Sequence, residues 1–97
     1  MNDEKTDEFR RFARIFKALS DPTRLQILRR LQEGEDCANV IQRSLGLSQS
    51  GLSYHMKILA EAGLVNCRQV AQRTYYSLNT EQLNLVADLI SSLGMRT

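Results

Sequence analysis

The feature that most constrains this chain is a tight link between two short helical segments, Leu45-Gly46-Leu47-Ser48. Gly46 suits the left-handed backbone conformation that ends a helix, and Ser48 is a good N-cap for the next helix. Apolar periodicity predicts the first of these helices at residues 36–44 and the second at residues 49–62. Two short helices joined in this way form a helix-turn-helix.

Two short extended segments follow directly, at residues 64–70 and 74–78. The first alternates in polarity, and the second contains Tyr75-Tyr76, which favours a strand. The Ala71-Gln72 connection between them lacks the usual Asn-Gly or Asp-Gly hairpin signal. A helix-turn-helix followed at once by a hairpin is the layout of a winged helix-turn-helix. The expected fold class is therefore mainly α with a small β-hairpin wing.

The rest of the chain adds two helices before this unit and one after it. Residues 6–19 and 80–94 carry apolar side chains at spacings of three and four. Asp21 can cap a second helix that has Pro22 in its first turn. That helix is expected to bury four side chains, Leu25, Ile27, Leu28 and Leu31. Because nothing resembles a linker or a repeat, residues 1–97 are expected to form one domain of the order α-α-α-α-β-β-α.

Composition and charge limit the functional classes. The chain is 42% hydrophobic and 25% charged, as in ordinary globular domains, and its first ten residues are too acidic for a secretory signal. No apolar run approaches the roughly 20 residues that cross a bilayer, so we expect a cytoplasmic protein without a membrane partner. Residues 43–77 hold four basic residues against Glu61, a net charge of +3 that favours a polyanionic partner.

The helix at residues 49–62 has one apolar and one polar face. Its core-facing stripe is formed by Leu52, His55, Met56 and Leu59. Its polar face consists of short hydrogen-bonding side chains and one cation, namely Gln49, Ser50, Ser53, Tyr54 and Lys57. Glutamine pairs well with adenine in the major groove, and a lysine one turn further on would meet a phosphate. Taken alone, such a face is also what an ordinary surface helix shows.

The segments on either side of this helix favour DNA binding. Ser48 at the helix start directs free N–H groups and the positive end of the helix dipole toward a phosphate. Arg68, Gln72 and Arg73 lie on or near the expected hairpin tip, where a wing contacts the backbone or the minor groove. Double-stranded DNA is therefore the expected partner.

Three motifs, in this order, resemble those of the ArsR-type metal- and redox-responsive repressors. Residues 21–28 are similar to the family signature DPTRLxIL, and residues 47–59 are similar to its recognition-helix motif LSQxxxSxHLKxL. Ala62-Gly63-Leu64-Val65 and Tyr75-Tyr76-Ser77-Leu78 are similar to the usual entry to and exit from the wing. The resemblance covers residues 12–78 without a gap.

The resemblance implies a homodimeric repressor that an inducer releases from a palindromic operator. It assigns dimerisation to the first and last helices, at residues 6–19 and 80–94. The interface candidates are their apolar side chains, Phe9, Phe12, Phe16, Val86, Leu89, Ile90 and Leu93. The alternative is that these side chains only cover the core of the monomer. We favour the interface, because a 97-residue chain has more apolar helix face than one small core can use.

Neither of the metal sites common in the family is complete. The first uses two cysteines and an acidic residue, but here Cys37 is followed by Asn39 and Val40 at the other two positions. The second uses Asp and His pairs on the last helix, which offers Asp88 and no histidine. The only histidine, His55, is expected to pack on the core side. We therefore expect no metal site and no cofactor, although a metal or metalloid effector stays open.

Cys37 and Cys67 are the remaining candidates for an effector site. Cys37 lies near a helix N-terminus, which favours a reactive thiolate, and Cys67 has Arg68 beside it. Oxidation or an electrophile at Cys37, with or without Cys67, would change the angle between the DNA-binding units of a dimer. The alternatives are that both cysteines only pack as small hydrophobic residues, or that they bind arsenite or another soft ion.

An enzyme is not expected, because the chain lacks a Ser-His-Asp set, a glycine-rich phosphate loop and paired carboxylates in an apolar setting. The alternative from another class is a winged helix that binds protein instead of DNA. Such a surface would show exposed Leu, Trp or Arg anchors, and the polar face at residues 49–62 argues against it. The expected function is sequence-specific DNA binding by a transcription regulator.

Overall fold

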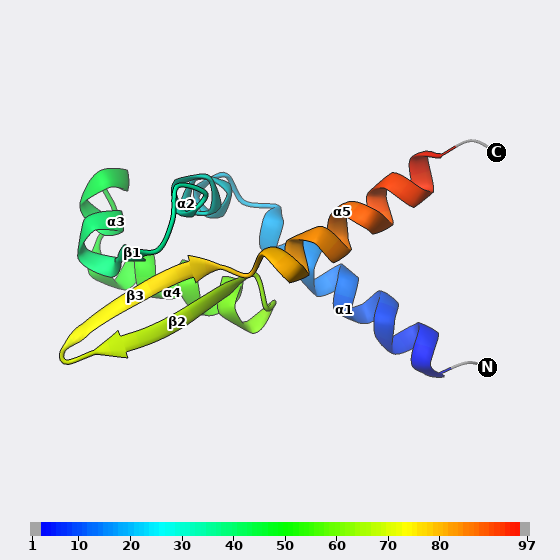
Figure 1. Cartoon of the computed structure of the whole chain (residues 1–97), viewed down its shortest axis with the longest axis horizontal. Coiled ribbons are helices and arrows are strands. Elements are labelled where there is room, and N and C mark those ends of the chain that lie inside the picture. Colours follow the sequence, from blue (N-terminus) through cyan, green and yellow to red (C-terminus); the bar gives the residue numbers. More distant parts are fainter. Residues whose placement is uncertain (1–2, 96–97) are drawn as a thin grey trace.

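The computed structural model describes residues 3–95 of the 97-residue chain as five helices and a three-stranded sheet (Figure 1). In chain order the elements are α1 (Asp3–Leu19), α2 (Pro22–Leu31), β1 (Asp36–Cys37), α3 (Ala38–Leu45), α4 (Gln49–Glu61), β2 (Val65–Val70), β3 (Arg73–Leu78) and α5 (Thr80–Gly94). We call residues 22–78, from α2 to β3, the head. We call α1 and α5 the arms, because both extend from the head toward the same end of the molecule (Figure 1).

Local chemistry explains where the helices begin and end. Asp21, Ser48 and Asn79 each accept, through a side-chain oxygen, the backbone N–H three residues further on, at 3.0, 3.0 and 3.2 Å. These bonds satisfy N–H groups that have no partner within the helix. Gly46 ends α3 with a φ of 66°, a left-handed conformation that suits glycine. The expected caps at both ends of the helix-turn-helix link are therefore present.

The hydrophobic core lies mainly inside the head. The most completely buried side chains of the head come from α2, α3, α4 and the residue just before β2: Ile27, Leu31, Ile41, Met56, Leu59 and Leu64. The arms add a few side chains where they join the head, namely Phe12, Ile15 and Ala18 of α1 and Val86 of α5. The core thus fixes α4 against α2 and α3 while leaving the far ends of the arms outside it.

The sheet is antiparallel, with the strand order β1-β3-β2. Val70 pairs with Arg73, so only Ala71 and Gln72 form the turn of the β2–β3 hairpin. Ala71 has a backbone φ of 55°, a value that residues other than glycine rarely adopt. A positive φ at the first central residue is what tight hairpin turns require, although the sequence lacks the glycine that usually supplies it.

The fold class expected from the sequence is confirmed, with one strand added. Residues 36 and 37 were expected to begin a helix but form β1, whose partners in β3 are Tyr76 and Tyr75. Leu25 was expected inside, but it is 51% exposed because α2 turns the side of Ile27 and Leu31 toward the core. α1 begins at Asp3, three residues before the expected start.

Candidate nucleic-acid interface

α4 presents its polar face to solvent at the edge of the head. Leu52, Met56 and Leu59 are buried against the core, as the helical stripe indicated. The polar candidates from the sequence are all exposed, and they are Ser48, Gln49, Ser50, Ser53, Tyr54 and Lys57. The side chains that could meet a groove of DNA are therefore free to do so, and the core holds the helix behind them.

The N-terminal half of α4 and the wing tip line one polar hollow of about 180 Å³. Gln49 and Ser53 contribute from α4, and Gln72 and Arg73 contribute from the hairpin. This hollow brings together four of the predicted DNA-binding residues, from segments about twenty residues apart in the chain. Its walls also include two residues of α3 that sequence reasoning missed, Asn39 and Gln42. Their only signal in the sequence was polarity just before the helix-turn-helix link.

Tyr54 and Lys57 are not part of this hollow. Tyr54 is 62% exposed and lines a separate hollow of about 460 Å³, together with Arg14 and Lys17 of α1. Lys57 is exposed on the same helix, one turn beyond Ser53. Both side chains therefore flank the polar hollow at the wing, and neither lines it.

Arg68 does not lie at the wing tip. It lies in the middle of β2, opposite Tyr75, and its guanidinium is 5.2 Å from the centre of that ring. Its Nε and Nη2 donate to the two carboxylate oxygens of Glu35, both at 2.7 Å. Hydrogen bonding between the two side chains holds the pKa of Glu35 below its usual value and raises the pKa of Arg68. Of the three residues expected on or near the tip, Gln72 and Arg73 therefore lie at it, and Arg68 lies two residue pairs before the last pair of the hairpin, Val70–Arg73.

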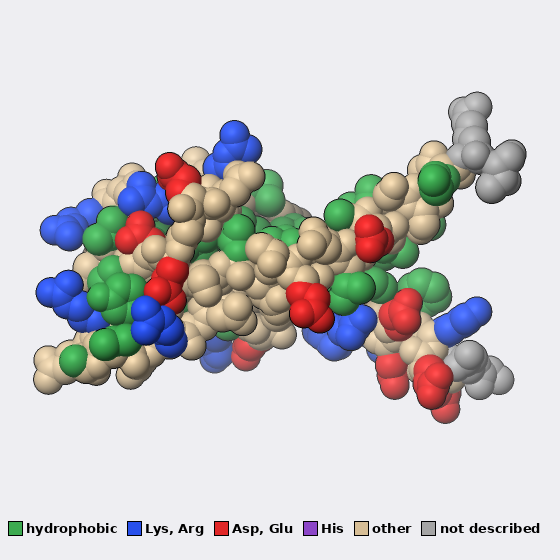
Figure 2. All heavy atoms as spheres, viewed as in Figure 1, with side chains coloured by type: hydrophobic (Ala, Val, Ile, Leu, Met, Phe, Trp, Pro, Cys, Tyr) green, Lys and Arg blue, Asp and Glu red, His purple; other side chains and the backbone are tan. Residues whose placement is uncertain are grey.

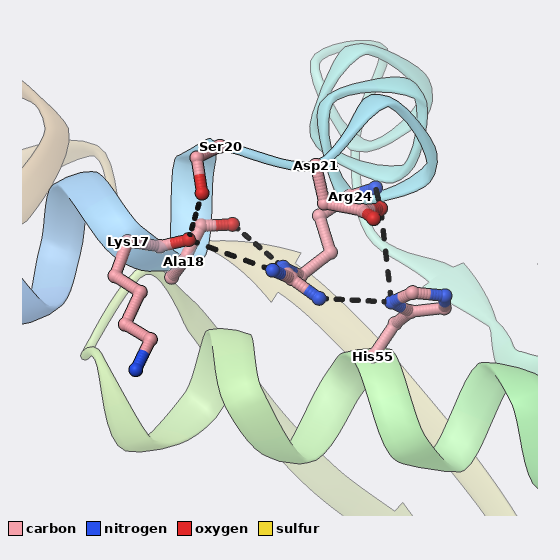
Figure 3. Close-up of polar contacts among 6 residues, drawn as sticks. All are labelled: Lys17, Ala18, Ser20, Asp21, Arg24 and His55. Carbon is pink, nitrogen blue, oxygen red and sulfur yellow. Dashed lines mark hydrogen bonds and ion pairs between the residues drawn. The ribbon is translucent and has the colours of Figure 1, made fainter.

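A buried arginine joins α1, α2 and α4 (Figure 3). Arg24 of α2 is 9% exposed, and its Nε donates to the carbonyl oxygen of Ala18 at 2.6 Å. Its Nη1 lies 3.2 Å from Nδ1 of His55, within hydrogen-bond distance. His55 packs on the core side as expected, and its hydrogen-bond partner there is the side chain of Arg24.

Asp21 completes this junction. One carboxylate oxygen accepts the backbone N–H of Arg24 at 3.0 Å and lies 3.9 Å from Nδ1 of His55. The backbone N–H of Arg24 is the main reason that the pKa of Asp21 is lowered, and the charge of Arg24 acts in the same direction. The sequence carried a signal for this junction, since Arg24 falls on the helical stripe of Ile27 and Leu31.

The two cysteines lie apart. Cys37 is 8% exposed at the N-cap of α3, whereas Cys67 is exposed in β2. Because β3 separates their strands, their Cα atoms are roughly 10 Å apart, at about 4.8 Å for each strand spacing. A disulfide needs a Cα separation of about 4.4–6.8 Å, so Cys37 and Cys67 of one protomer cannot pair without backbone movement. Among residues 3–95, no group of three or more His, Cys, Asp or Glu is placed to hold a metal ion.

The interface candidates on the arms divide into two groups. Phe12 and Val86 belong to the core of the protomer, with exposures of 8% and 4%. Four others project from the arms with exposures of 37–77%, namely Phe9, Phe16, Ile90 and Leu93. Leu89 is partly buried against the core. Figure 2 shows hydrophobic side chains at the surface of both arms.

Comparison with known proteins gives the class first. Residues 19–68 match the model of a family described as a helix-turn-helix domain. The solution structure of the homodimeric winged helix-turn-helix DNA-binding domain Mb0332 from Mycobacterium bovis has a TM-score of 0.81 and 28% identity, over 99% of this chain and 92% of that one. The fold and its exposed polar helix therefore define a winged helix-turn-helix DNA-binding domain.

The curated relatives narrow this class. The arsenical resistance operon repressor of Bacillus subtilis is 38% identical over 85 residues, which are 87% of this chain and 81% of the relative. The reduced form of HlyU from Vibrio cholerae has a TM-score of 0.73 and 33% identity, over 98% of this chain and all of that one. The chain belongs to the ArsR family of transcriptional regulators, as its three sequence motifs predicted.

Membership of this family settles the general function. The chain is a DNA-binding transcriptional regulator, a class that is not enzymatic. Within residues 3–95, no helix is both long and apolar enough to cross a bilayer.

Proposed function

We propose that this protein is a cytoplasmic homodimeric repressor that reads a palindromic operator with α4 in the major groove and the wing tip on the adjacent backbone or minor groove. The observation that carries the proposal is the polar hollow that Gln49 and Ser53 share with Gln72 and Arg73. Gln49 and Ser53 offer hydrogen bonds to base edges, and Arg73 offers a cation to phosphate. Ser48 and the N-terminus of α4 add free N–H groups for a further phosphate.

The arms support the homodimer. Exposed apolar side chains on α1 and α5 cost free energy in water, and a second copy of the same surface would cover them. The Mb0332 domain, similar over 99% of this chain, is described as homodimeric. Two copies related by a two-fold axis would present two α4 helices to two half-sites, which is the geometry that a palindromic operator needs.

The effector in this proposal is thiol-reactive. Cys67 is exposed, so reagents in solution reach it directly, whereas the burial of Cys37 favours packing at that position. Anisotropy of labelled operator DNA, repeated with diamide and with arsenite, tests release by thiol chemistry. Loss of the response in Cys67→Ser but not in Cys37→Ser would assign the response to the exposed thiol. No response in the wild type would remove thiol release from the proposal.

The DNA-binding surface is tested on duplexes enriched from a random library by the wild-type protein. The double variant Gln49→Ala and Ser53→Ala should lose at least about tenfold in specific affinity, since a good base contact contributes about 1–3 kcal/mol. Its affinity for random duplex should change little. Asn66→Ala, exposed on β2 away from the tip, is the matched control. No binding by the wild type at low salt would favour a protein-interaction module.

A further inference from the structure

Glu35 and Arg68 meet at the place where the wing leaves the rest of the sheet. The last residue of β1, Cys37, pairs with Tyr75, and Tyr75 pairs on its other side with Arg68. Beyond this row, only the pairs Gln69–Thr74 and Val70–Arg73 hold the hairpin together. An isolated two-stranded ribbon is only marginally stable in water. The direction of the tip therefore depends on the contacts that the residues of this row make with the rest of the head.

The side chain of Arg68 fixes that row to the segment before β1. Its Nε and Nη2 donate to both oxygens of Glu35, each at 2.7 Å, in the paired geometry that is strongest for a guanidinium and a carboxylate. Its guanidinium also lies over the ring of Tyr75, at 5.2 Å from the ring centre. One side chain of β2 therefore contacts β3 and reaches across it to the residue that precedes β1.

The same contacts make Arg68 a poor phosphate ligand. Glu35 already accepts two of its N–H groups, and the charges of the pair cancel at a distance. A phosphate would also meet the carboxylate of Glu35. Arg73 differs, because it is exposed at the tip and has no ion pair among residues 3–95.

We infer that Arg68 is a positioning residue, whose ion pair with Glu35 fixes the direction of the wing tip relative to α4 for DNA binding. This inference rests on the proposed function for its role in affinity. It replaces the direct phosphate contact that the sequence suggested for Arg68. Arg73 and Gln72 then contact the DNA at the tip, and Glu35 and Arg68 contribute only by holding the tip in place.

The two roles predict opposite effects for a change at Glu35. If Arg68 bound phosphate, Glu35→Gln would free a cation and remove a negative charge, and DNA affinity would rise. If the pair positions the wing, Glu35→Gln and Arg68→Gln both weaken binding. An exposed ion pair contributes little, so we expect each loss to be about two- to fivefold.

The test measures the affinity of the full chain for the enriched duplex by fluorescence anisotropy at several salt concentrations. We expect Arg68→Gln and the double variant to weaken binding to the same extent, and Glu35→Gln to weaken it by no more than that. The bond between Glu35 and Arg68 is lost in all three, whereas the contact with Tyr75 is lost only without Arg68. We expect the salt slope of Arg68→Gln to equal that of the wild type. The control Arg73→Gln should reduce the slope by about 0.9, the value for one lost phosphate contact. Tighter or unchanged binding by Glu35→Gln, or a reduced slope for Arg68→Gln, would overturn the inference.

Hydrogen exchange of the wing amides gives a second measurement that needs no DNA. Glu35→Gln should speed exchange at residues 69–73 and leave α4 unchanged, since the pair restrains the hairpin only. Unchanged exchange in the wing would overturn the inference even if the wild type binds no DNA. Faster exchange in the wing without DNA binding would instead count against the proposed function alone.

Discussion

The head and the arms use their apolar residues in opposite ways. α4, in the head, buries Leu52, Met56 and Leu59, and its exposed side is polar apart from Tyr54 and Ala60. α5, an arm of similar length, buries only Val86. Exposure makes the contrast plain, since Leu59 is 0% exposed whereas Leu93 is 77% exposed.

This difference separates two effects of burying apolar surface, which can stabilise the fold of one protomer or the association of two. In the head, most apolar side chains are buried within one protomer, so their burial stabilises the fold, and α4 is left with a mainly polar surface for DNA. In the arms, the apolar side chains that lie outside the core stay in water until another surface covers them, so they can stabilise only an association. Substitutions in the core of the head should therefore lower the stability of the fold, and substitutions of the exposed apolar residues of the arms should weaken dimerisation.

The largest expected effect is a core substitution in the head. Leu59→Ala should lower the free energy of unfolding by about 2–5 kcal/mol, because it removes a fully buried side chain and leaves a cavity. Chemical denaturation monitored by circular dichroism measures this loss. The matched control, Leu93→Ala, should stay within about 0.5 kcal/mol when the free energy is corrected for protein concentration. Equal losses in the two variants would contradict the contrast between head and arms.

The second effect concerns association. The double variant Ile90→Glu and Leu93→Glu should raise the dimer dissociation constant by about 100-fold or more, since like charges brought together across an interface cost several kcal/mol. Sedimentation measures the constant, and circular dichroism should show an intact head. Asn84→Glu, exposed on the same helix, is the control for added charge. A wild type that stays monomeric at all concentrations would show that these side chains face solvent.

The contrast was only partly predictable from the sequence. Helical periodicity and capping residues predicted α1 to α5, and alternating polarity and strand-favouring residues predicted the wing, because these signals act over a few residues. The same periodicity could not tell Val86, inside the core, from Leu93, outside it, since both lie on one stripe of α5. β1 was missed because its two residues gain their partners from Tyr75 and Tyr76, almost forty residues later.

The third effect is at Arg24, where the head joins α1. Arg24→Ala should lower the free energy of unfolding by about 1–3 kcal/mol, because the carbonyl of Ala18 and the imidazole of His55 lose their buried donor. It should also weaken DNA binding, since His55 belongs to α4. Arg24→Lys should recover only part of both losses, because an ammonium lacks the planar fork that reaches two partners. Arg29→Ala, exposed on the same helix, is the control. An Arg24→Ala variant as stable as this control would show that the junction contributes nothing.

The candidate site was predictable where one helix carries it. The polar face of α4 follows from its amphipathic pattern, and Gln49 and Ser53 were found in this way. The roles of Arg24 and Arg68 depend on His55 and Glu35, partners that are 31 and 33 residues away. A pattern within one helix or strand carries no information on such pairs, so the contacts of Arg24 with His55 and of Arg68 with Glu35 could not be predicted.

The smallest expected effect is the pH dependence of stability. The pKa of Glu35 is lowered in the folded chain from its usual value of 4.5, mainly by the bond from Arg68. An acid whose pKa is lowered by folding stabilises the fold fully above its unfolded pKa, and this contribution is lost as the pH falls through the folded pKa. The melting temperature should therefore fall below about pH 4.5, and it should fall less steeply in Glu35→Gln.

Arg68→Gln separates the cause of this dependence from the carboxyl group itself. It keeps Glu35 but removes the guanidinium that lowers its pKa, so the fall in melting temperature should be as shallow as in Glu35→Gln. Asp21→Asn should make the melting temperature less dependent on pH in a different range, below about pH 3.8, because the pKa of Asp21 is lowered mainly by the backbone N–H of Arg24. If Arg68→Gln instead kept the wild-type slope, the pair would not form in solution. The direction of the wing relative to the rest of the head would then depend on other contacts.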